Sequence, residues 1–394
     1  MFHDQHHPHH FLKNKEMNEL YISYAIFQFA VGIISIFEPI YLYKIGYSVT
    51  EILFYFLLVS VYFLAFSFLG TKIVSRLGVK HTMLSAVPLY IVYFLGLKFV
   101  AQAPVLFFVM PFFKAVKMQL YNYGFHLNFV EHSDRKKEGR EVALIQMGAL
   151  LAGGLAPFFG GMIIKFYSYP VLFGAGSVLL AVSMIPLFLT EDRHEKISFN
   201  KKDLFKGVLK KENRGALLNF SGYAVESWIG FILWPIFLYV IFKDTESVGL
   251  AASLSTVLTI ALFYVVGKKT DNANKEKMLR AGSVFYFFGW AARLFAYNFT
   301  SVFFIDTYKN LSMKFIQVPW SAYFYEEAKK RNYFYFIVER EIIFHFARII
   351  AVPFLMAIFY FNVAPYQIAF SIAALASLFY ATSIRSSKLK PAVR

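Results

Sequence analysis

The chain contains one internal repeat, and this repeat constrains the fold more than any other feature of the sequence. The segment EPIYLY at residues 38–43 returns as WPIFLY at residues 234–239, and the two prolines are 196 positions apart (235 − 39). Pro157 and Pro353, each followed by phenylalanine, have the same offset of 196 (353 − 157). Because the chain has 394 residues, close to twice this offset, we expect two related halves that arose by duplication.

Both halves are strongly apolar. Charged residues make up only 16% of the chain, against roughly 25% in a soluble domain. The segment 52–69 holds no charged side chain, and a helix of about 20 such residues crosses a bilayer core of about 30 Å. Backbone groups in lipid must be hydrogen-bonded internally, so we predict an all-α membrane protein with twelve transmembrane helices. The predicted spans cover residues 18–43, 51–69, 82–97, 104–128, 142–164, 170–189, 215–242, 248–266, 278–297, 300–324, 334–360 and 364–383.

The distribution of basic residues predicts the topology of these spans. Lysine and arginine gather in the tails, the central linker and alternate loops, whereas the other loops hold only Lys44, Lys98, Lys165 and Lys243. This bias places both termini and the linker in the cytoplasm. It also explains the net charge of +16, so no nucleic-acid partner is expected. The predicted segments are a His-rich tail (1–17), the first half (18–189), a linker (190–214), the second half (215–384) and a tail (385–394).

The sequence offers little for catalysis. Cysteine is absent, which excludes thiol chemistry, and no zinc motif, phosphate loop or Ser-His-Asp arrangement occurs. Five of the first ten residues are histidine, and we expect a tail with incidental metal affinity rather than a metal site. A membrane enzyme is the weaker reading, with His126 and Glu131 as its nearest candidates. We therefore expect neither enzymatic activity nor a cofactor.

Two loop segments resemble a motif of a known family. The first contains Arg76, Gly78 and Lys80, which match the motif. It has Thr71 where the motif has glycine and Ser75 where the motif has aspartate. The second keeps a glycine and an aspartate, and it lies 196 residues later (267 − 71). Both resemble the pattern Gly-x-x-x-Asp-Arg-x-Gly-Arg-Arg of the major facilitator superfamily, which joins helices 2–3 and, more weakly, 8–9. The retained residues of the second copy are Gly267 and Asp271.

The fifth predicted span carries a further resemblance to the same superfamily. Its small residues and proline resemble the helix 5 motif with Gly-Pro-x-x-Gly-Gly, which is frequent in proton-coupled exporters. Ala156 replaces the glycine before the proline, a departure that weakens the link to export. Small side chains on a helix permit close approach of a neighbour. The motif residues are Gly148, Gly153, Gly154, Pro157, Gly160 and Gly161.

The resemblance covers essentially the whole chain and implies a fold and a mechanism. It implies two pseudo-symmetric six-helix bundles, with helices 1, 4, 7 and 10 around a central cavity, that alternate in access to the two sides. It also implies that Asp271 and Arg140 help to hold the inside gate shut, whereas Ser75 lacks the charge for the equivalent latch. The superfamily pattern Arg-x-x-Gln-Gly of helix 4, associated with proton coupling, is not present.

Several ionisable residues fall inside predicted spans, where each charge costs at least about 2.5–3.5 kcal/mol near the bilayer centre. One interpretation is a substrate site, with lysines binding an anionic or zwitterionic solute and Glu226 and Asp306 serving as counter-charges or proton carriers. The other is structural pairing between helices, and for Arg293 near a span end we expect snorkelling to the interface. The candidates are Lys114, Lys117, Lys309, Lys314, Glu38, Glu226, Asp306, His345 and Arg348.

The resemblance and these charges imply a secondary transporter in the cell membrane. Proton-coupled export of a lipophilic or amphipathic compound is the interpretation that the resemblance favours. An organic-anion carrier with a lysine-lined cavity is the alternative within transporters. A non-transporting receptor or scaffold is the alternative of another class. The expected partners are a small molecule, protons and the lipid bilayer, and the expected state is a monomer.

Overall fold

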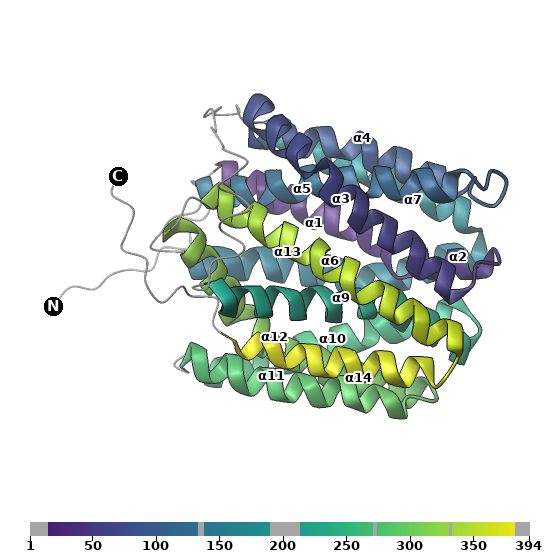
Figure 1. Ribbon diagram of the computed structural model, residues 1–394. Coiled ribbons are helices and arrows are strands. Elements are labelled where there is room, and N and C mark those ends of the chain that lie inside the picture. Colours follow the sequence, from purple (N-terminus) through teal and green to yellow (C-terminus); the bar gives the residue numbers. More distant parts are fainter. Residues whose placement is uncertain (1–14, 133–137, 190–212, 271–273, 331–332, 383–394) are drawn as a thin grey trace.

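The computed structural model of the chain describes residues 15–132, 138–189, 213–270, 274–330 and 333–382, and these residues are helical almost throughout (Figure 1). The N-terminal half consists of α1 (Lys15–Ser35), α2 (Phe37–Lys44), α3 (Val49–Leu77), α4 (Val79–Leu97), α5 (Leu106–His132), α6 (Glu138–Phe166), α7 (Tyr169–Met184) and the 3-10 turn η2 (Ile185–Phe188). The C-terminal half consists of α9 (Arg214–Phe242), α10 (Thr245–Thr270), α11 (Lys275–Ala292), η4 (Arg293–Phe295), α12 (Phe299–Lys330), α13 (Tyr333–Phe361), α14 (Pro365–Ser377) and η5 (Leu378–Ala381).

The described helices are long and lie side by side with alternating direction (Figure 1). In the N-terminal half, α1 packs against α6 and α7, and α4 packs against α5 and α7. In the C-terminal half, α9 packs against α13 and α14, and α11 packs against α12 and α14. The halves meet mainly where α3 contacts α13 and where α6 contacts α10, and Figure 1 shows α13 crossing beside α3.

Apolar composition identifies an integral membrane protein. Within the described residues, 7 helices are long and apolar enough to cross a membrane, and two shorter apolar helices cover Leu150–Phe166 and Pro365–Ala381. The helices α5, α11 and α12 are not among the seven. Of these, α5 and α12 carry lysines in their middle.

The connection between α3 and α4 differs from the predicted loop. We expected the second span to end at residue 69, but α3 continues through Thr71 and Ser75 to Leu77. A single residue, Gly78, separates it from α4, with φ of 81° and ψ of 170°. This positive φ is open to glycine at little cost, so the chain reverses here within one residue. The start of α3 is set by a capping box in which Ser48 and Glu51 satisfy each other's backbone N–H.

The glycines of the fifth-span motif lie where α1 and α10 approach α6. A Cβ at Gly160 would meet the carbonyl oxygen of Ile33 in α1, and a Cβ at Gly161 would lie 2.8 Å from the carbonyl oxygen of Thr245 in α10. Gly153, on the same helix, has open space around its Cβ position. The helix α6 therefore packs closely between α1 of its own half and α10 of the other half. A side chain at Gly160 or Gly161 would prevent these backbone contacts. Three other motif residues also have close neighbours. Gly154 lies against Thr256, and Pro157 lies against Gly249. A Cβ at Gly148 would lie 4.0 Å from the Cβ of Ala25.

This packing predicts opposite effects of one substitution at two glycines of α6. Gly160→Ala forces backbone atoms apart and is expected to destabilise the protein by about 1–3 kcal/mol. Gly153→Ala is expected to be neutral or to stabilise it by about 0.5–1 kcal/mol, because alanine favours the helix. Intrinsic tryptophan fluorescence during heating in detergent measures both. Equal unfolding temperatures for the two variants would contradict the packing described for Gly160.

Candidate functional site

Two adjoining cavities lie between the halves. The larger has a volume of about 520 Å³ and is lined mainly by α1, α5, α12 and α13. The smaller has a volume of about 300 Å³ and is lined by α1, α2, α4, α5 and α9. Both volumes lie within or near the usual range of ligand sites, about 300–1,000 Å³. Residues that line both cavities are Tyr24, Gln28, Met118, Asn122, Phe125 and His126.

The charged residues of the two cavities are mostly cationic. Lysine and arginine contribute five side chains to the lining and glutamate two, an excess of three positive charges (5 − 2). The five cations are Lys114 and Lys117 in the smaller cavity and Lys314, Arg340 and Arg348 in the larger. The two carboxylates are Glu38 and Glu341. The combined site is therefore electropositive within an apolar protein.

In the smaller cavity, Lys114 is paired with Glu38. The Lys114 ammonium lies 2.5 and 2.7 Å from the two Glu38 oxygens. Tyr93 also donates a hydrogen bond to Glu38. Lys114 further lies over the rings of Phe56 and Phe231, at 4.6 and 4.7 Å, and Phe231 belongs to α9 of the other half. The pair thus joins α2 to α5 and touches the opposite half.

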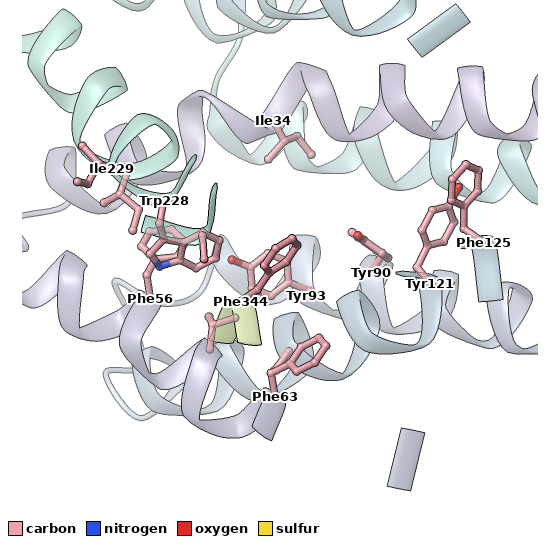
Figure 2. Close-up of a cluster of buried hydrophobic side chains, with 14 of the residues drawn as sticks. Ile34, Phe56, Phe63, Tyr90, Tyr93, Tyr121, Phe125, Trp228, Ile229 and Phe344 are labelled. Carbon is pink, nitrogen blue, oxygen red and sulfur yellow. The ribbon is translucent and has the colours of Figure 1, made fainter. Parts of the chain in front are cut away.

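Lys117, one turn further along α5, has no carboxylate partner among the described residues. Its ammonium lies over three rings, at 3.5 Å from the centroid of Tyr90, 4.2 Å from that of Tyr93 and 4.9 Å from that of Phe94. Figure 2 shows Tyr90 and Tyr93 among the buried rings beside α5. Cation–π contacts of this kind compensate a buried ammonium only in part. Lys117 therefore presents uncompensated positive charge to the smaller cavity.

The larger cavity contains two further cations without an ion-pair partner in the described structure. Lys314 of α12 donates to the amide oxygen of Gln317 at 2.8 Å. Arg348 of α13 donates to the carbonyl oxygen of Ala224 at 3.3 Å and lies over the ring of Trp228 at 4.0 Å. Neither side chain has a carboxylate partner among the described residues. The larger cavity therefore also contains basic side chains that an anion could pair with.

The third cation of the larger cavity is paired. Arg340 forms an ion pair with Glu341, and Asn122 of the other half donates to Glu341 at 3.3 Å. Arg340 is 4% exposed. The sequence analysis did not single out Arg340 or Asn122 as binding residues, and it named His126 only as a candidate of a membrane enzyme. Met118, Asn122 and His126 follow one another at i+4 on α5, and this spacing was the available signal.

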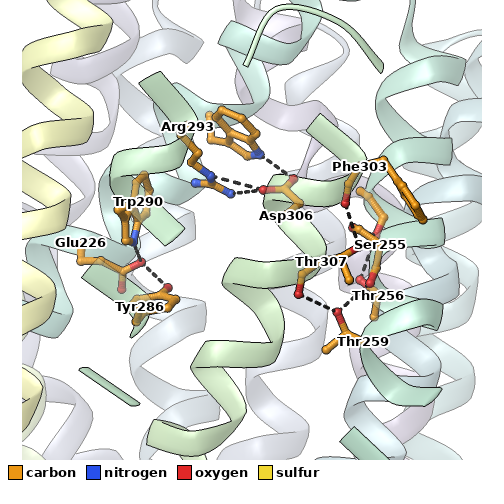
Figure 3. A network of polar contacts seen from close by, with 12 residues as sticks. Glu226, Ser255, Thr256, Thr259, Tyr286, Trp290, Arg293, Phe303, Asp306 and Thr307 are labelled. Atoms are coloured by element: carbon orange, nitrogen blue, oxygen red, sulfur yellow. Dashed lines mark hydrogen bonds and ion pairs between the residues drawn. The ribbon is translucent and has the colours of Figure 1, made fainter. Parts of the chain in front are cut away.

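Glu226 lies outside both cavities. Its carboxylate accepts hydrogen bonds from Tyr286 at 2.6 Å and Trp290 at 2.9 Å (Figure 3). It also accepts one from Tyr380 at 3.0 Å. Lys309 lies over two of these rings, at 4.8 Å from Tyr286 and 5.0 Å from Trp290. The three donors satisfy the carboxylate inside the C-terminal half. The predicted residues Glu226 and Lys309 therefore form one cluster, separate from the cavity cations.

Asp306 is paired with Arg293, and the expectation that Arg293 snorkels to the interface is wrong. Arg293 is 3% exposed, and its guanidinium lies 2.7 Å from one Asp306 oxygen, as Figure 3 shows. Trp234 donates to the other Asp306 oxygen at 3.0 Å. The ion pair with Asp306 stabilises the Arg293 charge inside the protein, where water at the interface would otherwise do so. Asp306 therefore has its counter-charge without a substrate.

His345, a candidate site residue, does not line either cavity. Glu341 and Arg348 line the larger cavity, but His345 is fully buried and stacks on Phe63 of α3, with ring centroids 3.8 Å apart. Neither ring nitrogen has a hydrogen-bond partner among the described residues. Positions i and i+4 of a helix differ by about 40° in direction, which suffices here to turn His345 from the cavity to α3.

The residues of the loop motif lie away from the cavities. Lys80 forms an ion pair with Glu19 of α1 at 3.2 Å. The hydroxyls of Thr71 and Ser75 bond to carbonyl groups of their own helix, and Arg76 is exposed. Gly267 lies near the end of α10. The Arg140 side chain and Asp271 lie outside the described residues, as do the tails and nearly all of the linker.

Comparison with known families identifies the chain. The family model described as Major Facilitator Superfamily matches residues 20–333. The chain therefore belongs to the major facilitator superfamily of membrane transporters, and the resemblance noted in its loop and helix motifs is confirmed. Transporters of this superfamily are generally not enzymes, and they act on small molecules in a membrane. A comparison with curated proteins returned no match.

The Arg293–Asp306 pair generates a stability prediction. Arg293→Met leaves a buried aspartate without its cation and is expected to destabilise the protein by about 3–5 kcal/mol. The double variant Arg293→Met/Asp306→Leu removes both charges and is expected to recover most of that loss. Unfolding in mixed detergent micelles measures both. A double variant no more stable than the single one would show that the pair has another role.

Proposed function

We propose that this transporter moves an organic anion with an apolar body by alternating access. The observation that supports the proposal is the excess of positive charge in the two cavities, where lysine and arginine outnumber glutamate by five to two. Uncompensated charge inside a membrane protein is costly and marks substrate or ion pathways. An anionic solute supplies the missing counter-charge, whereas a cationic solute would meet like charges.

The aromatic lining supports the apolar part of the substrate. Tyr24 and Phe125 stack with ring centroids 4.3 Å apart and line both cavities. Trp320 and Phe324 stack at 5.8 Å and line the larger cavity. Flat rings of this kind contact planar or aliphatic groups with little loss of side-chain freedom. The cavity thus combines cationic groups for orientation with a large apolar contact surface.

Contacts between the halves on both sides of the cavities support alternating access. On one side, Lys165 of α6 lies 2.5 Å from Glu246 of α10. On the other side, His126 of α5 lies 2.9 Å from the Tyr325 hydroxyl of α12, and Phe129 packs on the same ring at 4.5 Å. Contacts of this kind can break and re-form as two rigid units rock around a central site.

The proposed architecture and orientation follow from packing and charge. We assign twelve spans to two six-helix bundles, with α1 and α2 forming one broken span, because most helix contacts stay within each half of the chain. The bias of lysine and arginine toward alternate loops supports cytoplasmic placement of both termini and of the linker. The substrate site then lies between the bundles, as superfamily membership leads us to expect.

Glu38 is the carboxylate that we propose for proton coupling. It lines the smaller cavity, and its only cationic partner in the described structure is Lys114. Protonation of Glu38 would free Lys114 for the substrate, which links the two binding events. Glu226, the candidate that the sequence favoured, accepts three hydrogen bonds away from both cavities. It is better suited to holding α9 against α11.

A lipophilic substrate is the second candidate, and the aromatic lining favours it. The same rings that contact an apolar body of an anion also accept an uncharged amphipathic compound. Export of such compounds was the expectation from the helix 5 motif. The two candidates differ in whether the cationic side chains contribute to binding.

Binding to charge variants tests the proposal. Arg348→Gln removes a charged hydrogen-bond donor from the larger cavity and is expected to weaken aromatic carboxylate binding about tenfold or more. Lys309→Gln removes a buried lysine that lines neither cavity and is expected to change the dissociation constant less than twofold. Titration of purified protein with 2-naphthoate, followed by tryptophan fluorescence, gives both constants. Equal, small effects would favour the lipophilic candidate.

Coupling is tested by comparing two carboxylates in proteoliposomes. Glu38→Gln is expected to retain exchange of substrate across the membrane but to lose accumulation driven by a pH gradient. Glu226→Gln is expected to lower the unfolding temperature while keeping the response to the gradient. The opposite pattern would assign coupling to Glu226.

A further inference from the structure

The two halves differ in the groups that surround a buried lysine, and the internal repeat shows which residues correspond. Tyr90 and Phe94 correspond to Tyr286 and Trp290 under the offset of 196 (286 − 90 and 290 − 94). In the N-terminal half, Lys117 lies over the rings of Tyr90 and Phe94. In the C-terminal half, Lys309 lies over the rings of Tyr286 and Trp290, although it stands one helical turn away from the position that the offset relates to Lys117. A lysine over two matched rings therefore occurs twice in the fold.

The carboxylate that completes this cluster occurs only once. In the C-terminal half, Glu226 accepts hydrogen bonds from the same two rings that lie under Lys309. The offset of 196 relates Glu226 to Ala30 (226 − 196), a fully buried residue without a charge. The carboxylate that lines the smaller cavity, Glu38, already pairs with Lys114. The Lys117 cluster thus lacks the anion that its counterpart contains.

One hydrogen-bond donor close to Lys117 also lacks an acceptor. The hydroxyl of Tyr121, one turn further along α5, is buried and has no hydrogen-bond partner among the described residues. Tyr121 lines the smaller cavity with Lys117, and its ring contacts Tyr90, the ring that lies under Lys117, as Figure 2 shows. Buried donors without an acceptor are costly. One oxyanion in this cavity would supply an acceptor and a counter-charge together.

We propose that Lys117 and Tyr121 form a second anion subsite, so that the transported solute is a dianion with an apolar body. This proposal rests on the proposed transport of organic anions. One anionic group binds in the smaller cavity. It supplies the negative charge that Glu226 supplies in the other half and that Ala30 does not. The other binds at Lys314 and Arg348 in the larger cavity, and the body lies along the rings that line both.

Matched probes with one or two carboxylates test the subsite in the purified full-length protein. We would use benzoate with terephthalate, and naphthalene-2-carboxylate with naphthalene-2,6-dicarboxylate. The dicarboxylate of at least one pair is expected to bind about tenfold or more tightly than its partner. Lys117→Gln is expected to abolish this preference, because it weakens dicarboxylate binding far more than monocarboxylate binding.

A second variant supplies the missing carboxylate from within the chain. Ala30→Glu is expected to neutralise Lys117, as Glu226 is placed to do for Lys309, and to reduce the dicarboxylate preference without removing the lysine. Equal binding of mono- and dicarboxylates, with Lys117→Gln affecting both alike, overturns the second subsite and leaves anion transport standing. Absence of binding for all four probes overturns anion transport and the subsite together.

Discussion

The cost of holding charge inside a membrane protein is the constraint on which the rest of the structure depends. An ionisable side chain within a span needs a partner, water or a ligand, because lipid offers none of these. Away from the cavities, two sites of the described C-terminal half meet this need internally: Arg293 pairs with Asp306, and three aromatic donors satisfy Glu226. The cavity lining does not, since Lys117 and Arg348 have no carboxylate partner there.

This difference separates the charges that hold helices together from those available to a solute. The Arg293–Asp306 pair links η4 to α12, and the Glu226 cluster links α9 to α11 and η5, so these charges fix helices within one half of the chain. The cavity cations stand on α5, α12 and α13, where the halves face each other. A solute bound there would contact both halves, which is the arrangement that alternating access requires.

The sequence was sufficient for the class of fold but not for the pairing of its charges. Apolar runs and the offset of 196 predicted long helices in a membrane protein, and the motifs identified the superfamily. Lys114, Lys117 and Lys314 were expected at a cavity and line it. The partners of Arg293 and Glu226 were not predictable, because each residue turns a helix by about 100° and the rotation of α9, α11 and α12 is set by packing. The same rotation placed His345 against Phe63 rather than in the cavity.

The sign of the charge that the cavity selects is the central claim, and one binding series measures it. Three probes share one body: 2-naphthoate, 2-naphthamide and 2-naphthylmethylammonium. Titration of the wild-type protein by tryptophan fluorescence gives a dissociation constant for each. The account predicts that the carboxylate binds at least about tenfold more tightly than the amide and that the ammonium binds most weakly. Tightest binding of the ammonium would contradict it.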